Sequence, residues 1–140
     1  MKTNQIFVVV CVAVAGFVFW HALFGRAGWS PDFQDDYEAT LVKAMDQKKP
    51  LVVKFYADWC PPCKEMDKNV LPSQEVRAVA DRALWVKVDV DQQGKLADDF
   101  GVQSIPTTLI IDPKGNIIHR LVGPPSPTEL AEKILSVAGS

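Results

Sequence analysis

The sequence predicts an α/β fold, in which a central mixed sheet of about four strands is flanked by helices and preceded by one N-terminal transmembrane helix. Three observations carry this prediction. A run of 19 residues near the N-terminus is almost free of charge. Strand-like and helix-like segments then alternate, which favours parallel strands joined by helical crossovers. Near the C-terminus two strand-like runs are separated by a tight turn, which is typical of an antiparallel hairpin.

The N-terminal run, residues 6–24, is apolar or small throughout except for His21. A helix of this length measures about 28 Å, just enough to cross the hydrocarbon core of a bilayer. Lys2 before the run favours a cytoplasmic N-terminus and an exported remainder, although Arg26 on the other side weakens that signal. We therefore expect three parts: a membrane anchor over residues 1–27, a linker over residues 28–32 and a folded domain over residues 33–140.

A cleaved signal peptide is the alternative to a permanent anchor. Gly25 and Ala27 are small residues at a spacing that suits cleavage after Ala27. The apolar run is, however, longer than the h-region of about 7–15 residues in a usual signal. We therefore favour an uncleaved anchor, in which Cys11 is a small apolar residue of the membrane helix.

The first helix of the domain is predicted over residues 30–48, with Ser30 as N-cap and Pro31 at the first helical position. Apolar residues recur there at every fourth position, namely Phe33, Tyr37, Leu41 and Met45. Pro50 ends the helix. Residues 51–57 are β-branched, aromatic and almost continuously apolar, which predicts a central strand covered on both faces.

The remaining segments follow from capping and turn signals. Helices are expected from Cys60 to Val70 and, after the interruption at Pro72, from Ser73 to about Ala83. Further along the chain we expect a strand over 84–90, a short helix over 95–100 capped by Gly101, strands over 107–111 and 117–122, and a closing helix that starts at the capping box Ser126-Pro127-Thr128-Glu129. The hairpin turn spans residues 112–116, where Gly115 allows a positive φ.

The chemistry of the sequence is concentrated in Cys60-Pro61-Pro62-Cys63, at the boundary between a strand and a helix. A separation of three residues is close to one helical turn, so both sulfurs lie on one face and can form a disulfide. A helix N-terminus also favours the reactive thiolate. Zinc would need four ligands, and Cys11, His21 and His119 stand apart, so we expect no metal. A purely structural disulfide stays open as an alternative.

The charge of the chain excludes one class of partner. The formal net charge is −2, and residues 28–140 hold all 17 acids and 13 of the 15 bases. This is an ordinary soluble surface with no basic stripe, so nucleic acid is not expected as a partner.

Four motifs give residues 33–138 a resemblance to the thioredoxin family: Tyr56-Ala57-Asp58-Trp59-Cys60-Pro61-Pro62-Cys63-Lys64, Gly101-Val102-Gln103-Ser104-Ile105-Pro106-Thr107-Thr108, Lys114-Gly115 and Val122-Gly123. Residues 57–67 are most similar to the C-terminal, periplasmic domain of the disulfide interchange protein DsbD and to membrane-anchored periplasmic thioredoxins. The resemblance implies a thioredoxin fold with a cis peptide bond between Ile105 and Pro106. It also implies that Trp59, Ile105 and Pro106 take part in binding the substrate, with the Ile105 backbone presented to it; for Trp59, plain core packing is the alternative.

The sequence departs from the family at one position. Where the family commonly has a buried acid, six residues before the first cysteine, this chain has Lys54, and the family's strand lysine corresponds to Lys87. Our hypothesis is that Asp67, four residues after Cys63, accepts the proton of Cys63 and pairs with Lys54 or Lys87. In the alternative, Lys54 extends to solvent and Asp67 is merely exposed.

A mechanism follows from the order of the two cysteines. We expect Cys60, at the exposed end of the helix, to attack a substrate disulfide, and Cys63 to resolve the mixed disulfide. Pro61 and Pro62 remove two N–H donors and leave mainly the amides of Cys63 and Lys64 to stabilise the thiolate. The pKa of Cys60 should therefore be lowered only modestly, which makes the disulfide stable and the dithiol a reductant.

The sequence thus predicts a membrane-anchored, extracytoplasmic thiol-disulfide oxidoreductase that reduces disulfides of client proteins. We expect a monomer in the inner membrane, with its domain in the periplasm, a membrane-embedded thiol as electron donor and no cofactor beyond the Cys60–Cys63 disulfide. The alternatives are a thiol oxidant or disulfide isomerase and, less favoured, a non-catalytic metal-binding module, for which Met66 is the nearby candidate ligand.

Overall fold

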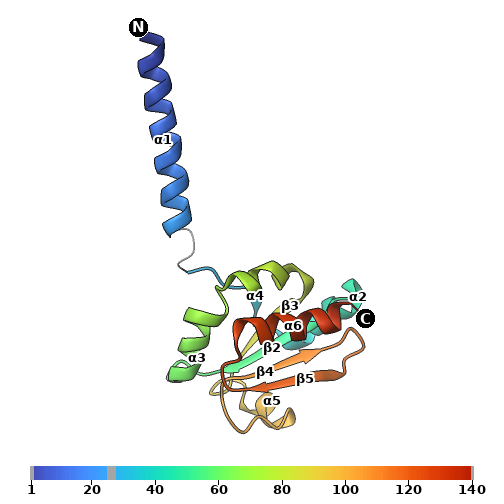
Figure 1. Ribbon diagram of the computed structural model, residues 1–140. Coiled ribbons are helices and arrows are strands. Elements are labelled where there is room, and N and C mark those ends of the chain that lie inside the picture. Colours follow the sequence, from blue (N-terminus) through green and yellow to red (C-terminus); the bar gives the residue numbers. More distant parts are fainter. Residues whose placement is uncertain (1, 25–27, 140) are drawn as a thin grey trace.

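The computed structural model describes residues 2–24 and 28–139, with side chains over residues 8–19 and 28–139. In these residues a five-stranded sheet has the order β1-β3-β2-β4-β5 (Figure 1). The strands are β1 (Phe33–Gln34), β2 (Leu51–Tyr56), β3 (Leu84–Asp89), β4 (Thr107–Ile111) and β5 (Ile117–Val122). β1, β3 and β2 are parallel, whereas β4 is antiparallel to both β2 and β5. The predicted mixed sheet is confirmed, but it has one strand more than expected.

The additional strand, β1, replaces the predicted start of the first helix. Phe33 pairs with Trp85 of β3, and the two rings meet edge to face with their centroids 5.7 Å apart. Helix α2 (Tyr37–Gln47) therefore begins later than predicted, at the N-cap Asp36, whose carboxylate accepts the Ala39 N–H at 3.0 Å. The prediction of Ser30 as N-cap was wrong because a contact with a strand some fifty residues away decides the conformation of Phe33.

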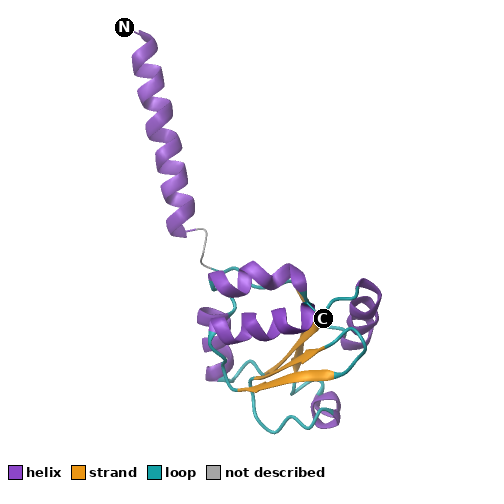
Figure 2. Cartoon of the chain, turned by 45° about the vertical axis from the view of Figure 1, so that its right-hand side comes forward, coloured by secondary structure: helices purple, strands orange, loops and turns teal. Residues whose placement is uncertain are grey.

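Helices cover both faces of the sheet (Figure 2). One face carries α3 (Pro61–Glu65), the π-helix η1 (Met66–Val70), α4 (Gln74–Val79), the short 3₁₀ helix η2 (Ala80–Arg82) and α6 (Pro127–Ala138). The other face carries α2 and α5 (Gly94–Asp99). The α-helix predicted over residues 60–70 is therefore α-helical only in its first part. In the second part the Leu71 N–H reaches back five residues to the Met66 carbonyl at 3.0 Å, which gives the π conformation.

Strand β2 lies in the middle of the sheet and is buried along both faces, as predicted. Side chains alternate across a strand. Val53 and Phe55 belong to the core beneath α2 and α5, whereas Val52 belongs to the core beneath α4 and α6. Lys54 shares the face of Val52, so a buried lysine points toward the helices that follow the dithiol.

The closing hairpin has the predicted turn, and the last helix has the predicted N-cap. Asp112 Oδ1 accepts the N–H groups of Lys114 and Asn116, both at 2.8 Å, and Gly115 has a φ of +89°. Hydrogen bonds from the Asn116 side chain and backbone lower the pKa of Asp112. Helix α6 begins at Ser126, whose Oγ accepts the Glu129 N–H at 3.1 Å.

The N-terminal segment forms helix α1 (Lys2–Phe24). Valine and phenylalanine side chains between residues 8 and 19 are exposed along it. Within the described part of the chain, no helix combines the length and the apolarity needed to cross a membrane. The predicted cleavage position after Ala27 lies outside the described residues.

Candidate active site

The two cysteines lie where the chain passes from the end of β2 into helix α3. Cys60 is the N-cap of α3, and Cys63 lies in its first turn. Their sulfurs form a disulfide, with the two Cα atoms 5.3 Å apart. Pro61 and Pro62 occupy the first helical positions, as expected for residues that lack an N–H donor.

Burial does not distinguish the two cysteines. Cys60 is 2% exposed and Cys63 1%, so the prediction that Cys60 lies at an exposed end is not met. The physical reason is a small apolar cluster around the disulfide, to which Tyr56, Val90 and Ile105 contribute from three separate segments.

Hydrogen bonding does distinguish them. The Cys63 N–H donates to Cys60 Sγ at 3.2 Å, so the main chain already presents a donor to the first sulfur. In this disulfide form the Lys64 N–H instead donates to the Cys60 carbonyl at 3.2 Å, so its predicted role toward the thiolate stays a prediction. In the described structure, Cys60 Sγ therefore has a single main-chain donor.

The loop before β4 brings a second segment to the disulfide. The Ile105–Pro106 peptide bond is cis, as the family resemblance implied. Thr107 Oγ1 donates to the Ser104 carbonyl at 2.7 Å, and the Gly123 N–H donates to the Pro106 carbonyl at 2.8 Å. These bonds fasten the loop, and Ile105 packs against the cluster that surrounds the cysteines.

Trp59 lies on the surface next to the disulfide. Its side chain is 65% exposed, which rules out plain core packing. The indole Nε1 donates to Asp91 Oδ2 at 2.8 Å, so the exposed ring has a fixed orientation. Trp59, Val90, Val102 and Ile105 line a groove of about 250 Å³. The exposed Trp59 ring and the hydrogen-bonded loop at Ile105 thus border a groove beside the disulfide.

Asp67 pairs with Lys54, one of the two lysines that we considered as its partner. Lys54 is 4% exposed and Asp67 about half exposed, and the ammonium donates to the Asp67 carboxylate. The same Nζ lies 5.3 Å from the centroid of the Tyr56 ring and 6.0 Å from that of Phe33. The alternative in which Lys54 reaches solvent is therefore wrong. The role of Asp67 as a proton acceptor stays a prediction.

Lys87 has a different partner from the one considered. Its Nζ lies 3.5 Å from Asp35. Partial burial raises the pKa of the nearby Tyr56; Lys87 lowers it, and Asp89, Asp58 and Asp35 raise it further. Acidic residues therefore gather at the carboxyl ends of the parallel strands.

Sequence reasoning missed Asp35 and Asp91. Asp91 could have been found, because it follows a predicted parallel strand, and functional groups collect at that edge of a sheet. Asp35 follows β1, which the sequence pattern did not predict.

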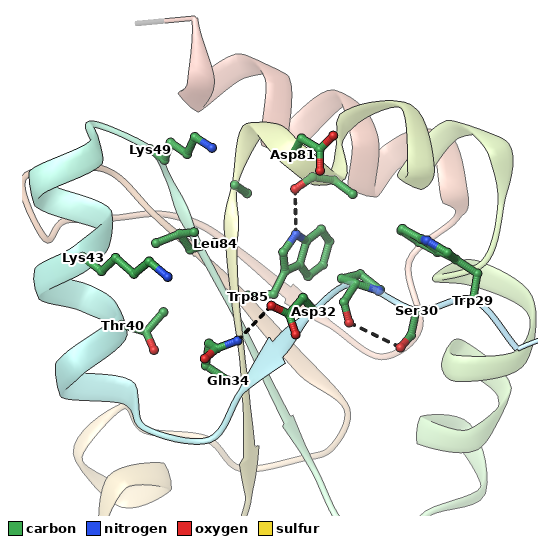
Figure 3. Close-up of a pocket in the computed structure, with 13 residues that line it drawn as sticks. Trp29, Ser30, Asp32, Gln34, Thr40, Lys43, Lys49, Asp81, Leu84 and Trp85 are labelled. Atoms are coloured by element: carbon green, nitrogen blue, oxygen red, sulfur yellow. Dashed lines mark hydrogen bonds between the residues drawn. The ribbon is translucent and has the colours of Figure 1, made fainter.

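A second hollow, of about 470 Å³, lies at the amino end of β3 (Figure 3). The disulfide instead follows the carboxyl end of the parallel β2. The segment before β1 and helix α2 supply part of its wall, including Asp32 and Lys43. No predicted site residue lines it. Across the described residues, no three His, Cys, Asp or Glu side chains are grouped so that they would hold a metal ion.

Fold and site together define a thiol-disulfide oxidoreductase whose redox centre is its own cysteine pair. A sequence model of the family Thioredoxin matches residues 32–136, and the chain belongs to this family. Members of the family use a redox-active disulfide and no further cofactor, as predicted.

The relatives include a thioredoxin and a DsbD protein. Thioredoxin H4 of Arabidopsis thaliana is 32% identical over 105 residues, which cover 75% of this chain and 85% of that protein. The thiol:disulfide interchange protein DsbD of Pseudoalteromonas atlantica is 32% identical over 88 residues, which cover 60% of this chain but 15% of that protein. The C-terminal domain of Neisseria meningitidis DsbD, solved in the reduced form, has 27% identity and a TM-score of 0.61, covering 71% of this chain and 92% of the domain.

Proposed function

We propose that this protein is a membrane-tethered reductant of protein disulfides that works outside the cytoplasm. The observation that carries the direction is the single main-chain donor to Cys60 Sγ, the Cys63 N–H at 3.2 Å. Few donors and no histidine between the cysteines leave the thiolate weakly stabilised. A weakly stabilised thiolate favours the oxidised protein, so electrons flow from the dithiol to the substrate.

The reaction has two exchanges. The Cys60 thiolate attacks one sulfur of a substrate disulfide, forms a mixed disulfide and releases the first substrate thiolate. Cys63 then loses its proton and attacks Cys60 Sγ, which forms the Cys60–Cys63 disulfide and releases the second substrate thiolate. Two electrons pass from the protein to the substrate, and an external dithiol must restore the reduced state.

Lys54 and Asp67 prepare the second exchange in this proposal. Lys54 is buried on the face of β2 that α4 and α6 cover, and its ammonium group forms an ion pair with Asp67. Asp67 is half exposed, so its carboxylate can accept the Cys63 proton and return it to solvent. Lys87, paired with Asp35 at the edge of the site, adjusts the local charge.

Tethering is supported by the apolar run over residues 6–24 of the sequence. The similarity to a DsbD protein supports a membrane-embedded dithiol as the electron donor. A tether would raise the effective concentration of the domain at such a donor. We further propose that the protein is a monomer of the inner membrane and that its thioredoxin-like domain lies in the periplasm. Carbonate extraction tests the tether: recovery of the full chain in the soluble fraction would refute it.

Equilibration with glutathione buffers tests the direction of electron flow. We expect a reduction potential well below that of a strong oxidant, and a value near about −120 mV would instead make the protein an oxidant. An isomerase would rearrange scrambled disulfides without net reduction, which a parallel refolding assay detects. A metal-binding module is not favoured, because Met66 is completely buried and cannot reach a bound ion.

A further inference from the structure

The groove beside the disulfide combines apolar walls with negative charge. Val90, Val102 and Ile105 supply apolar surface, and the exposed Asp98 lines the same groove. Asp91 holds the Trp59 ring at one side of the groove, and Asp58 precedes that tryptophan in the chain. A segment docked against Trp59 and Ile105 would therefore meet the Asp98 carboxylate in the groove wall, and the exposed Asp91 binds the Trp59 indole.

The Asp98 carboxylate is not held in an ion pair in the described structure, although its charge acts on the nearby Lys95. Among the described residues, Asp58 and Asp98 have no ion-pair partner and no hydrogen-bond partner for their carboxylates. The neighbouring base Lys95 is held by Asp99 at 2.7 Å.

Other bases near the disulfide lie on other elements, and the buried Lys54 among them is paired with Asp67. Lys87 is held by Asp35 at 3.5 Å. Lys64 follows Cys63 on α3 and does not line the groove. Among the residues that line the groove, Asp98 is the one with a charged side chain.

We propose that this groove selects disulfide-bearing protein segments with a basic residue next to the cystine, and that Asp98 is the specificity-determining residue. The inference rests on the proposed reductase function and adds a substrate class to it. A Lys or Arg side chain can lay its apolar stem along the walls and bring its charge to Asp98. Its charge also complements the surroundings of Trp59, and complementary potentials speed encounter more than they raise affinity.

The test uses two synthetic peptides that differ only in the residues flanking one disulfide, lysine in the first and glutamate in the second. The reduced full-length protein is mixed with each peptide, and the second-order rate constant is measured by rapid alkylation. At low salt we expect the lysine peptide to react roughly fivefold faster, a ratio that should approach one in concentrated salt as the charges are screened.

The Asp98→Asn variant should lower this lysine-to-glutamate ratio at low salt. The ratio cancels any change in the intrinsic reactivity of the dithiol. Asp46→Asn, the same change at an exposed position in the last turn of α2, is the matched control and should keep the wild-type ratio.

Equal rate constants for the two peptides, or a ratio that Asp98→Asn does not alter, would overturn the proposed selectivity and leave the reductase function in place. If neither peptide is reduced, the proposed function itself fails, and the selectivity fails with it.

Discussion

Lys54 of β2 and Asp67 of η1, thirteen residues apart in the sequence, form an ion pair beneath the helix that follows the disulfide. The buried acid that is common in the thioredoxin family is replaced here by a buried base with an acidic partner. The pair joins the central strand to the first turn of the π-helix, so a substitution at either position should affect both stability and redox chemistry.

Asp67→Asn is expected to slow the reduction of a protein disulfide and to change the shape of its pH–rate profile, because a carboxylate that accepts the Cys63 proton is lost. The measurement is insulin reduction across a range of pH, with Asp67→Glu as the conservative rescue. A profile that is identical to the wild type would remove Asp67 from the mechanism.

The same pair predicts a coupling in stability. Asp67→Ala leaves the buried Lys54 ammonium without its partner, and we expect a loss of about 1–2 kcal/mol in the free energy of unfolding, since the half-exposed carboxylate is partly screened. Lys54→Met in the Asp67→Ala background should recover part of this loss. Urea unfolding of the four proteins in this double-mutant cycle measures the coupling, and additive effects would show that the pair contributes nothing.

Cys63→Ser is expected to accumulate mixed disulfides between Cys60 and client proteins, because the resolving thiol is absent. Non-reducing electrophoresis and mass spectrometry identify the attached proteins. Cys11→Ser, which removes an exposed thiol on α1, is the control and should behave like the wild type. Trapping through Cys63 in a Cys60→Ser variant, and not through Cys60, would reverse the assigned roles.

Pro62→His is expected to raise the reduction potential by about 30 mV or more, since it restores one N–H donor and places a protonatable ring beside the thiolate. Pro127→His makes the same exchange in the first turn of α6 and should leave the potential unchanged. Equilibration with glutathione gives both values. An unaltered potential in Pro62→His would show that the donors at the helix N-terminus do not set the redox balance.

Asp112→Ala should destabilise the hairpin in a pH-dependent way. Its hydrogen bonds to Asn116 lower the pKa of Asp112, so its contribution is present above the ordinary value of 3.8 and is lost as the pH falls through the lowered pKa of the folded state. Urea unfolding at neutral pH should therefore separate the variant from the wild type. The difference should shrink well below pH 3.8, and a constant difference at both pH values would contradict this account.

The sequence by itself determined the features that local chemistry controls. Cys60 and Cys63 are one turn apart on a helix, so their pairing follows from spacing. The bounds of β4 and β5 and the start of α6 follow from the turn at Gly115 and from the cap at Ser126, since these residues satisfy backbone groups within a few positions of themselves.

Only the tertiary structure decided the features that depend on distant partners. Phe33 has the spacing of a helical residue but is extended because it packs on Trp85. Sequence spacing left the partner of Asp67 open between two lysines. Lys54 and Lys87 are register partners on neighbouring strands and lie on the same face of the sheet, so packing alone decides that Asp67 pairs with Lys54 while Lys87 lies beside Asp35. Trp59 stays at the surface because Asp91 lies within hydrogen-bonding distance. Such contacts are set by how the elements pack, and packing energies belong to pairs of segments that the local sequence does not bring together.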